Sequence, residues 1–550
     1  MFQKEDNAFY RCWKENSDDH TKTVLEQMDD RETADCFGGL PSFGTGGIRQ
    51  AEGIGPNRIN EVTIGWAAAA LARTLKEENE EKDMKKGVRI GFDTRKNSRL
   101  YAEKTALILN AYNIPTLLFE EPVPVPLLSF VLKREDRLCG VMITASHNPE
   151  NYNGFKVYNK SGGQCVPEEA ARIQNRFHRI DPFGIPQSTK EEAVSRGLFR
   201  TTGTAEEKAY LTAVTRHRVT DSGLIIAATP LHGASNKLLP LSLRTCGHRV
   251  FTVASQEKAD GTFPTVAAPN PEDPSVFEEV KAEGQRRNAH LLLVTDGDGD
   301  RCGCGIRHGD GYKILTGNES AAVLLCYLLK REKDRLPQDA YIVRTTVSGT
   351  LGERVAASYG VKTYTTPTGF KHIGAMLKDP TKGTFFAGYE ESGGFLYGNH
   401  AADKDGIAAA VLLAEAAEFY RRQGKTLVDV LNELNKKFGR EYTRTDRFAF
   451  PGRDGATRRE ACLRWFKEHP LRGGNMREED HTLFFQPGEG IKTALRPSGT
   501  EPELKLYRFI NANNDSEAER KNSIIDHRFL PVIHSFLPET DYSPKREVER

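Results

Sequence analysis

Hydrophobic and polar positions along the chain follow two patterns in turn, short apolar runs and longer segments with helical spacing. Residues 88–92, 140–143 and 341–343 are short apolar runs, and this pattern predicts buried strands. Residues 62–75 and 406–420 carry apolar side chains at helical spacing, which predicts two long helices. Strands and helices that alternate in this way are typical of α/β domains.

The succession of these patterns predicts four domains. We expect them at residues 1–203, 204–312, 313–437 and 438–550. The first three are expected to be α/β units of similar size, and the fourth a smaller α+β domain. A chain of 550 residues is too long for one hydrophobic core, which agrees with several domains. The Pro- and Gly-rich residues 181–186 predict a linker region.

The composition argues against several classes of protein. The formal net charge is +1, without the basic excess that is usual in nucleic-acid-binding proteins. No apolar run approaches the roughly 20 residues that a membrane-spanning helix needs, and residues 1–6 lack the apolar core of a signal peptide. The nine cysteines are scattered, which is typical of reduced thiols in the cytosol. We therefore expect a cytoplasmic protein with no nucleic-acid or membrane partner.

A candidate nucleophile follows the predicted strand at residues 140–143. Residues 144–149 read Thr-Ala-Ser-His-Asn-Pro, and α/β folds place their sites at the carboxyl ends of strands. Ser146 is a candidate nucleophile, with His147 or Lys156 to carry protons. An ordinary turn with Asn-Pro as a breaker explains the same loop about equally well.

Three aspartates alternate with glycines directly after another apolar run. Asp296, Asp298 and Asp300 are separated by glycines that let the backbone aim three carboxylates at one point, and such oxygen ligands suit Mg²⁺. A calcium EF-hand loop begins similarly, but it requires Gly and Glu where this chain has Arg301 and Arg307. The other alternative is a solvated acidic turn, although the mutual repulsion of three close carboxylates makes an ion-free cluster costly.

Two further loops carry side chains suited to sugars and phosphates. Residues 388–394 (Gly-Tyr-Glu-Glu-Ser-Gly-Gly) offer carboxylates and a hydroxyl for hydrogen bonds to sugar hydroxyls. Residues 496–502 (Arg-Pro-Ser-Gly-Thr-Glu-Pro), with Lys505 close behind, suit a phosphate and lack the Walker A pattern. Residues 43–49 place an arginine after a flexible glycine loop, and Asp405 is a candidate cap of the second predicted helix. Taken singly, each of these loops is also explained as a plain turn.

Taken together, the loops resemble those of the α-D-phosphohexomutase superfamily, in the family's order and over nearly the whole chain. The phosphoserine, metal, sugar and phosphate loops of that family match residues 144–149, 296–301, 388–394 and 496–502. Shorter segments agree as well, at residues 44–49, 153–156, 230–233, 366–369 and 403–406. The resemblance implies four domains around a central cleft, of which three are related α/β units with mixed sheets.

The resemblance also implies a mechanism. Ser146 would carry a phosphoryl group in the resting enzyme, and Asp296, Asp298 and Asp300 would hold Mg²⁺ with a phosphoserine oxygen as a further ligand. The enzyme would phosphorylate a sugar 1-phosphate at its far hydroxyl, and the bisphosphate would turn over in the cleft. The other phosphate would then return to Ser146, so glucose 1,6-bisphosphate would be both intermediate and activator.

The family's site residues carry over to matching positions of this chain. The catalytic group would be Ser146, His147, Lys156 and Arg49, with His147 and Lys156 as alternative proton carriers. The residues that would bind the substrate are Arg301, Thr368, Glu390, Ser392, Lys404, Arg496, Ser498, Gly499, Thr500 and Lys505. Of these, the last five would hold the phosphate that is not reacting, while Glu390 and Ser392 would bind sugar hydroxyls in both orientations.

The sugar loop indicates which phosphosugar is used. Its Glu-Glu-Ser sequence is closer to phosphoglucomutases, including the branch shared with phosphopentomutases, than to the Glu-Met-Ser form of bacterial phosphomannomutase/phosphoglucomutases. We therefore expect the reversible conversion of α-D-glucose 1-phosphate and glucose 6-phosphate by a monomer or dimer. Mannose and pentose phosphates are the alternative substrates. A non-catalytic scaffold is expected to have lost the serine or an aspartate, and a phosphatase leaves Ser146 and Arg496 unexplained.

Overall fold

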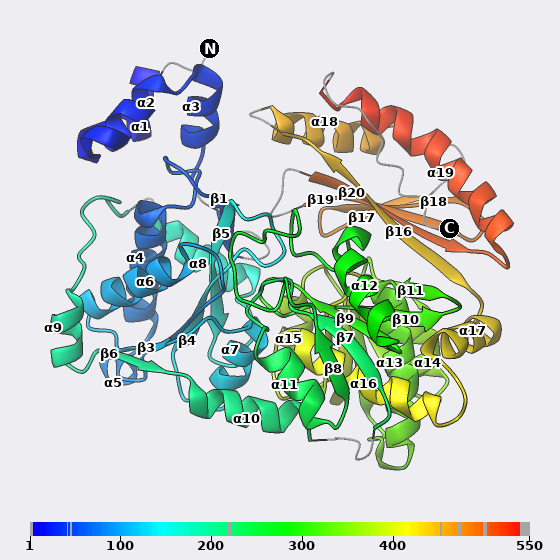
Figure 1. Cartoon of the computed structure of the whole chain (residues 1–550). Helices are drawn as coiled ribbons and strands as arrows, with labels where there is room; N and C mark the ends of the chain where they lie inside the picture. The colour runs from blue at the N-terminus through cyan, green and yellow to red at the C-terminus, as the bar shows by residue number, and fades with distance from the viewer. Residues whose placement is uncertain are drawn as a thin grey trace. The chain divides into compact units, whose positions relative to one another are not determined.

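The computed structural model describes residues 4–40, 42–43, 47–177, 179–216, 222–451, 454–469, 475–498 and 503–538. The chain divides into two compact units, Met1–Phe438 and Gly439–Arg550 (Figure 1). Within the described residues, the first unit contains three mixed sheets and the second contains one antiparallel sheet. This confirms the expected class of three α/β domains followed by a smaller α+β domain. The exact domain boundaries and the central cleft stay predictions.

Three short helices precede the first sheet, and the sequence analysis did not predict them. They are α1 (Ala8–Asn16), α2 (Asp19–Gln27) and α3 (Asp30–Phe37), and they follow a 3₁₀ turn, η1 (Lys4–Asp6). Each α-helix begins after a polar cap, since Asn7, Asp18 and Asp29 accept backbone N–H bonds from the first turn. Their inner faces meet in an aromatic cluster in which Trp13 and Phe37 pack edge to face.

The first domain is a six-stranded sheet with helices on both faces. Its strand order is β1 (Ile48–Ala51), β5 (Tyr152–Asn159), β4 (Cys139–Ile143), β2 (Val88–Phe92), β3 (Thr116–Phe119) and β6 (Phe199–Thr202). Its helices are α4 (Glu61–Glu78), α5 (Glu81–Met84), α6 (Ser98–Ala111), α7 (Val125–Leu132), α8 (Pro167–Phe177) and α9 (Lys190–Ser195). In Figure 1, α4 and α6 lie on one side of this sheet and α7 on the other, each over its own hydrophobic core.

The predicted strands at 88–92 and 140–143 and the predicted helix at 62–75 are all present in this domain. The linker expected at residues 181–186 is wrong, because β6 comes after it and pairs in parallel with β3 of the same sheet. That stretch is a loop inside the first domain, where the Phe183 ring packs edge to face against Trp13 of the N-terminal helices.

The second and third domains follow after helix α10 (Thr204–Val214). The second has the strand order β11 (Gly311–Leu315), β10 (Cys302–His308), β9 (Leu291–Thr295), β7 (Ile225–Thr229) and β8 (Arg249–Thr252), with α11 (Leu238–Thr245), η2 (Pro274–Phe277) and α12 (Glu278–Arg287). The third has the order β13 (Lys362–Thr366), β12 (Ala340–Thr345), β14 (Thr384–Tyr389) and β15 (Phe395–Tyr397). Its helices are α13 (Gly317–Glu332), η3 (Lys333–Arg335), α14 (Leu351–Ala357), α15 (Phe370–Met376), α16 (Gly406–Arg421) and α17 (Leu427–Phe438).

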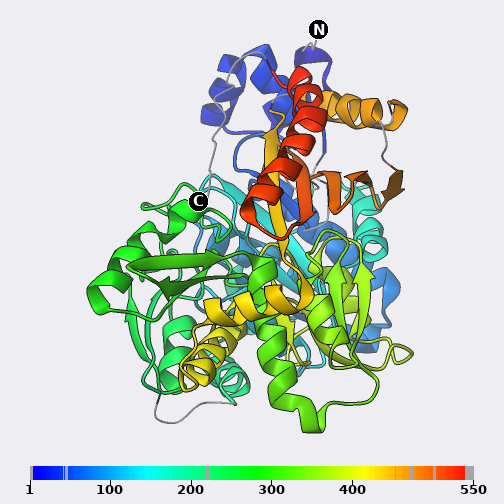
Figure 2. The same ribbon diagram turned by 90° about the vertical axis from the view of Figure 1, so that its right-hand side faces the viewer.

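The second and third domains share one hydrophobic core. Helices α13 and α16 contact strands of both sheets, and Figure 2 shows the ribbons of the two domains next to each other, in green and yellow-green. A single apolar cluster runs from β7 and β9 through these helices to β12 and β14. Asp405 caps α16, as expected, by accepting a hydrogen bond from Ala408 N at 2.8 Å. Because a buried core resists shear, this packing fixes the loops of the two domains relative to each other.

The three mixed sheets repeat one local arrangement. In each sheet, one strand has a parallel neighbour on one side and is followed in the chain by a strand that pairs with it in the antiparallel direction. These consecutive pairs are β4 with β5, β9 with β10, and β14 with β15. The loops inside these pairs contain Ser146, the three aspartates and Glu390 respectively. The carboxyl ends of parallel strands are the usual place for α/β sites, so the fold itself selects these three loops.

The second unit is an antiparallel sheet with two long helices. Its strand order is β16 (Glu441–Ala449), β20 (Glu503–Asn511), β19 (Ile491–Pro497), β18 (Thr482–Gly488) and β17 (Met476–Glu479), and α18 (Gly455–Glu468) and α19 (Asp515–Ser535) cover one face (Figure 1). Side chains of Phe466, Phe485 and Phe529 pack together in its core. Arg508, which is 1% exposed, ion-pairs with Asp446 and, at 2.7 Å, with Asp526.

Two findings bear on the environment of the protein. All nine cysteines are free thiols. In the part of the chain that the structure describes, no helix combines the length and the apolar character needed to cross a membrane.

Candidate active site

Ser146 lies in the loop between β4 and β5, at the carboxyl end of a parallel strand. Its backbone has a φ of 55°, in the left-handed region that residues other than glycine rarely occupy. The Thr144 hydroxyl accepts a hydrogen bond from Ser146 N at 2.8 Å and stabilises this turn. Strained backbone of this kind gathers at functional sites, where the surrounding contacts hold it in place.

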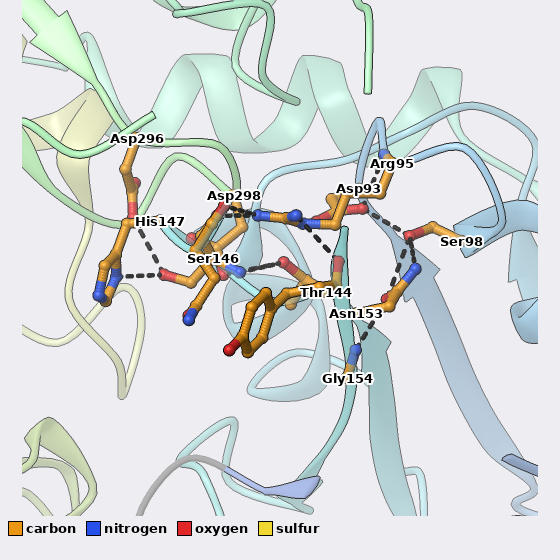
Figure 3. A network of polar contacts seen from close by, with 12 residues as sticks. Asp93, Arg95, Ser98, Thr144, Ser146, His147, Asn153, Gly154, Asp296 and Asp298 are labelled. Atoms are coloured by element: carbon orange, nitrogen blue, oxygen red, sulfur yellow. Dashed lines mark hydrogen bonds and ion pairs between the residues drawn. The ribbon is translucent and has the colours of Figure 1, made fainter. Parts of the chain in front are cut away.

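The Ser146 side chain contacts a carboxylate and an imidazole. Its hydroxyl donates to Asp296 Oδ2 at 3.1 Å, across from the loop between β9 and β10 (Figure 3). His147 Nδ1 lies 3.3 Å from the same hydroxyl oxygen. Ser146 is only 2% exposed, so these contacts lie in a largely water-free environment.

The three aspartates converge on one point, and the residues present fit a metal ion. Asp296, Asp298 and Asp300 are each 0% exposed, and their nearest oxygens all lie within 4.8 Å of one another. Asp298 Oδ1 and Asp300 Oδ1 are buried and have no hydrogen-bond partner among the residues that the structure describes, which is costly unless a further group binds there. A buried set of ligands made only of carboxylate oxygens suits a hard cation such as Mg²⁺.

Two lysines neutralise part of this negative charge. Lys156 Nζ lies 2.8 Å from Asp298 Oδ2, and Lys404 Nζ lies 2.6 Å from Asp300 Oδ2. Asp296 is held differently, since its Oδ1 accepts hydrogen bonds from two backbone N–H groups, at 2.9 and 3.0 Å. Two ammonium groups thus lie beside three carboxylates, so the cluster can balance a further positive charge.

The pKa values of the three carboxyl groups move apart. Burial and the neighbouring aspartates raise the pKa of Asp296 well above its usual range, and burial also raises the pKa of Asp300. Burial acts on Asp298 in the same direction, but the nearby Lys156 ammonium outweighs it and lowers the pKa of that group. Without a cation, the cluster thus opposes the ionisation of two of its three carboxyl groups.

The Glu390 loop joins the aspartate loop through the backbone. Arg301 and Gly394 form an antiparallel bridge, and Cys302 N donates to Gly393 O at 3.2 Å. Glu390 itself is buried, and its Oε1 accepts a hydrogen bond from Gly369 N at 3.1 Å. The structure therefore brings Glu390 next to the residues around Asp300.

The remaining predicted residues of the first unit lie around these loops. Arg49, on β1, donates from Nη1 to Asn148 Oδ1 at 2.9 Å and so reaches the Ser146 loop. Arg301 pairs with Glu272 at 3.0 Å, so its guanidinium is already held within the unit. Thr368 is buried beside Gly369, and its hydroxyl has no hydrogen-bond partner within the described residues. Ser392 is half-buried.

The predicted phosphate loop belongs to the second unit. Arg496 on β19 and Lys505 on β20 are directly opposite each other in the antiparallel register, so the two cations are neighbours. Ser498 is buried, and its backbone N–H donates to Glu503 O at 2.8 Å. Gly499 and Thr500 lie outside the described residues. Two adjacent cations and a serine at the end of a hairpin form a group that suits a phosphate.

Sequence reasoning missed two residues that hold the Ser146 loop. Thr144 accepts from Ser146 N and donates to Asp298 Oδ2 at 3.3 Å, which links the two loops. Arg95 is buried beneath the loop and donates to Ser146 O at 2.9 Å. The signal for Arg95 was the charged sequence Asp93-Thr94-Arg95 directly after the predicted strand at 88–92, because charges rarely follow a buried strand without a role.

Known proteins are similar to this chain in sequence and in fold. Family models described as phosphoglucomutase/phosphomannomutase, alpha/beta/alpha domains I, II and III, match residues 41–183, 208–309 and 316–438. A phosphoglucomutase of Staphylococcus saprophyticus is 30% identical over 92% of this chain and 97% of its own length. The chain therefore belongs to the phosphoglucomutase/phosphomannomutase family, within the α-D-phosphohexomutase superfamily. It is a phosphosugar mutase.

Solved structures agree with the fold. A phosphoglucomutase/phosphomannomutase family protein of Burkholderia thailandensis superposes with a TM-score of 0.69 at 16% identity, over 91% of this chain and 98% of that one. An N-acetylphosphoglucosamine mutase of Aspergillus fumigatus, solved with GlcNAc-6P and magnesium, gives a TM-score of 0.53 at 14% identity, over 90% of this chain and 96% of that one. At these identities the likeness shows the shared fold.

Proposed function

We propose that this mutase interconverts α-D-glucose 1-phosphate and glucose 6-phosphate through a phosphoserine at Ser146. The observation that carries the proposal is the 3.1 Å contact between the Ser146 hydroxyl and Asp296, inside a buried cluster of three carboxylates. A serine in this position has its oxygen beside the cluster that would bind a cation. The glucose preference follows the Glu-Glu-Ser loop and the relatives named phosphoglucomutase.

Asp296, Asp298 and Asp300 would hold Mg²⁺, together with an oxygen of the phosphorylated Ser146. When bound there, the ion would supply a positive charge that stabilises the negative charge on the transferring phosphoryl group. The chain's own residues keep the acceptor in line with Ser146 Oγ and keep water away. The fully buried carboxylates and the 2% exposure of Ser146 support this exclusion of water.

Proton transfer is assigned to His147 or Lys156. When the phosphoryl group leaves Ser146 Oγ, the phosphorus–oxygen bond to serine breaks and a bond to the sugar oxygen forms. The sugar hydroxyl gives up its proton to a base, and the serine oxygen takes up a proton as it leaves. His147 Nδ1 is 3.3 Å from Ser146 Oγ, whereas Lys156 Nζ is bound to Asp298 at 2.8 Å. The geometry favours His147 as the partner of the serine oxygen, and Lys156 as the group that keeps Asp298 ionised.

The other predicted residues are assigned to binding. Glu390 and Ser392 bind sugar hydroxyls, Arg496, Ser498, Gly499, Thr500 and Lys505 bind the phosphate that is not reacting, and Arg49, Arg301, Thr368 and Lys404 contact the substrate. Glucose 1,6-bisphosphate serves as intermediate and activator. The protein works in the cytoplasm as a monomer or dimer, with phosphosugars as its small-molecule partners.

A substrate panel tests the glucose preference. We expect kcat/KM for glucose 1-phosphate to exceed that for mannose 1-phosphate and ribose 1-phosphate by about tenfold or more, since one well-placed hydrogen bond discriminates by at least that factor. A trace of glucose 1,6-bisphosphate is expected to stimulate turnover by keeping Ser146 phosphorylated. Negligible turnover of glucose 1-phosphate contradicts the preference, and net release of inorganic phosphate as main product indicates a phosphatase instead.

The Glu390→Gln variant tests the sugar-binding role through pH. Burial raises the pKa of Glu390 to about 7, although Lys404 acts to lower it. The carboxylate that would accept hydrogen bonds from sugar hydroxyls therefore forms as the pH rises through about 7. The protonated form of Glu390 stabilises the fold, and this contribution to the free energy of unfolding is lost over the same rise in pH. We expect kcat/KM of the native protein to rise about tenfold relative to the variant between about pH 6 and about pH 8.

Comparing the two pH profiles cancels the titration of the substrate's own phosphate, because both proteins receive the same substrate. Parallel profiles across that range contradict a role for the ionised Glu390. The free energy of unfolding, measured at the same pH values, shows whether the carboxyl group titrates where burial places it.

A further inference from the structure

Arg95 binds the backbone of the whole Ser146 loop from beneath. It follows β2 and is 3% exposed. Nη2 donates to Ser146 O at 2.9 Å and to Asn148 O at 2.5 Å, and Nη1 donates to Pro149 O at 2.5 Å and to Tyr152 O at 2.9 Å (Figure 3). One guanidinium thus satisfies three carbonyls of the loop between β4 and β5 and the carbonyl of Tyr152, the first residue of β5.

The Arg95 side chain is itself fixed by its neighbours in the first domain. Its Nε lies 3.2 Å from Asp93 Oδ2, and Asp93 Oδ1 accepts hydrogen bonds from Arg95 N at 3.0 Å and Ser98 Oγ at 2.6 Å. Asn153, on β5 after the loop, donates to the Ser98 hydroxyl at 3.1 Å. The charge of the guanidinium is therefore paired, and its position is set by side chains on three elements (Figure 3).

The second domain closes over Arg95 from the opposite side. The Phe263 ring lies 5.0 Å from the guanidinium carbon, a distance that allows a cation–π interaction. Gly261 approaches so closely that a Cβ atom there would lie 2.4 Å from Arg95 Cα. Gly297, between the first two aspartates, would place a Cβ 2.8 Å from Ser146 O and 3.6 Å from the Phe263 ring. Arg95 therefore lies in the layer where the serine loop and the aspartate loop meet.

We propose that Arg95 is a positioning residue, which holds Ser146 Oγ at the aspartate cluster through the loop carbonyls and through Phe263. The proposal rests on the proposed role of Ser146 as phosphoryl carrier. A left-handed Ser146 is strained, and four donated hydrogen bonds on one side of the loop stabilise that conformation. A lysine has a single ammonium and cannot reproduce this planar fork of donors.

Arg89 provides a matched control. It lies on β2, the strand that Arg95 follows, is 0% exposed, and pairs with Glu135 at 3.3 Å and Glu206 at 2.9 Å. Its guanidinium carbon lies 4.2 Å from the ring centre of Phe119, so it also has an aromatic neighbour. The Arg89→Lys and Arg95→Lys variants therefore lose the same chemical group from similar buried surroundings, but only the second touches the serine loop.

The experiment combines kinetics with hydrogen exchange on the full chain. For Arg95→Lys we expect kcat to fall about 100-fold, because a displacement of about 1 Å in the reacting group has that effect, while KM changes less than about threefold. For Arg89→Lys we expect kcat within about twofold of the native value. Backbone amides of residues 144–152 are expected to exchange about tenfold faster in Arg95→Lys and at the native rate in Arg89→Lys.

The outcomes separate this proposal from the proposed function. Equal losses of kcat in the two lysine variants, or unchanged exchange of residues 144–152 in Arg95→Lys, overturn the positioning role. A native protein that turns over no phosphosugar overturns the proposed function, and the exchange comparison then still decides the role of Arg95. If Arg95→Lys fails to fold, the Phe263→Leu variant keeps Arg95 and removes the aromatic ring that contacts its guanidinium. That variant is expected to lower kcat about fivefold, whereas no change overturns the link to the second domain.

Discussion

The Ser146→Ala variant is expected to lose mutase turnover by at least about 10⁴-fold, because it removes the hydroxyl that would carry the phosphoryl group between the two ends of the sugar. The Ser146 hydroxyl is the only group of this side chain that contacts Asp296 and His147, at 3.1 and 3.3 Å. Alanine keeps the backbone and removes one hydrogen bond to a carboxylate, which costs about 1–3 kcal/mol of unfolding free energy. We therefore expect a folded protein without turnover.

Three measurements check this expectation. The rate of glucose 6-phosphate formation gives the loss of turnover, thermal unfolding confirms the fold, and intact mass shows whether the protein carries a phosphate before and after incubation with glucose 1,6-bisphosphate. The native protein is expected to gain the mass of one phosphoryl group, and the variant none. More than about a tenth of native turnover in Ser146→Ala contradicts a phosphoserine mechanism.

Ser161→Ala is the control for this variant. Ser161 lies just after β5 in the same domain, and its hydroxyl also donates one hydrogen bond to a side chain, at 2.6 Å to Asn159 Oδ1. Losing this bond costs the fold about as much as a neutral hydrogen bond is worth, about 1 kcal/mol. Ser161 lies beyond the end of β5 that is opposite to the Ser146 loop, and its hydroxyl bonds to Asn159 and not to an aspartate of the cluster. Its variant is therefore expected to keep full turnover.

The local chemistry of the site was readable in the sequence because each loop is short and follows an apolar strand. The spacing Asp296, Asp298, Asp300 puts three carboxylates on one tight turn whatever the rest of the chain does. The strands at 88–92 and 140–143 were predictable for the same reason, since buried parallel strands are nearly continuous apolar runs. Features that depend on a few neighbouring residues can therefore be predicted without knowledge of the tertiary fold.

The features that could not be predicted from the sequence depend on contacts between distant segments of the chain. The four carbonyl bonds of Arg95 join residues about fifty positions apart, and no local pattern encodes them. The stretch at 181–186 looked like a linker because Pro and Gly also mark loops inside domains, and only the pairing of β6 with β3 decides between the two. The register that places Arg496 opposite Lys505 is likewise set by the whole hairpin.

The second large effect is expected from Asp296→Asn, which should lower turnover about 10³-fold and raise the stability of the metal-free protein. The change would remove one of the three proposed ligands and so weaken the cation site, where a bound ion would supply several kcal/mol of transition-state stabilisation. Burial and the charges of Asp300 and Asp298 raise the pKa of Asp296, so its negative charge opposes folding when no cation is bound. A neutral amide of the same shape removes that repulsion.

The hydrogen bonds of Asp296 can survive the change. Its Oδ1 accepts from the backbone N–H groups of Asp300 and Arg301, and an amide oxygen accepts these bonds equally well. The amide nitrogen can donate to the Ser146 oxygen, which now accepts a bond where it formerly donated one. We therefore expect the melting temperature without metal to rise by about 2 °C or more. The increase on adding Mg²⁺ should become smaller than in the native protein.

Asp298→Asn separates this effect from a general loss of charge. Lys156 lies 2.8 Å from Asp298 and is only 3% exposed, so the same substitution there leaves a buried ammonium without its partner. Asp298→Asn should therefore lower the melting temperature without metal, in the opposite direction to Asp296→Asn, although both lose turnover. Asp310→Asn, on an exposed turn of the same domain, should change neither quantity. If Asp296→Asn and Asp298→Asn change the melting temperature without metal in the same direction, the proposed difference in charge balance between these carboxylates is wrong.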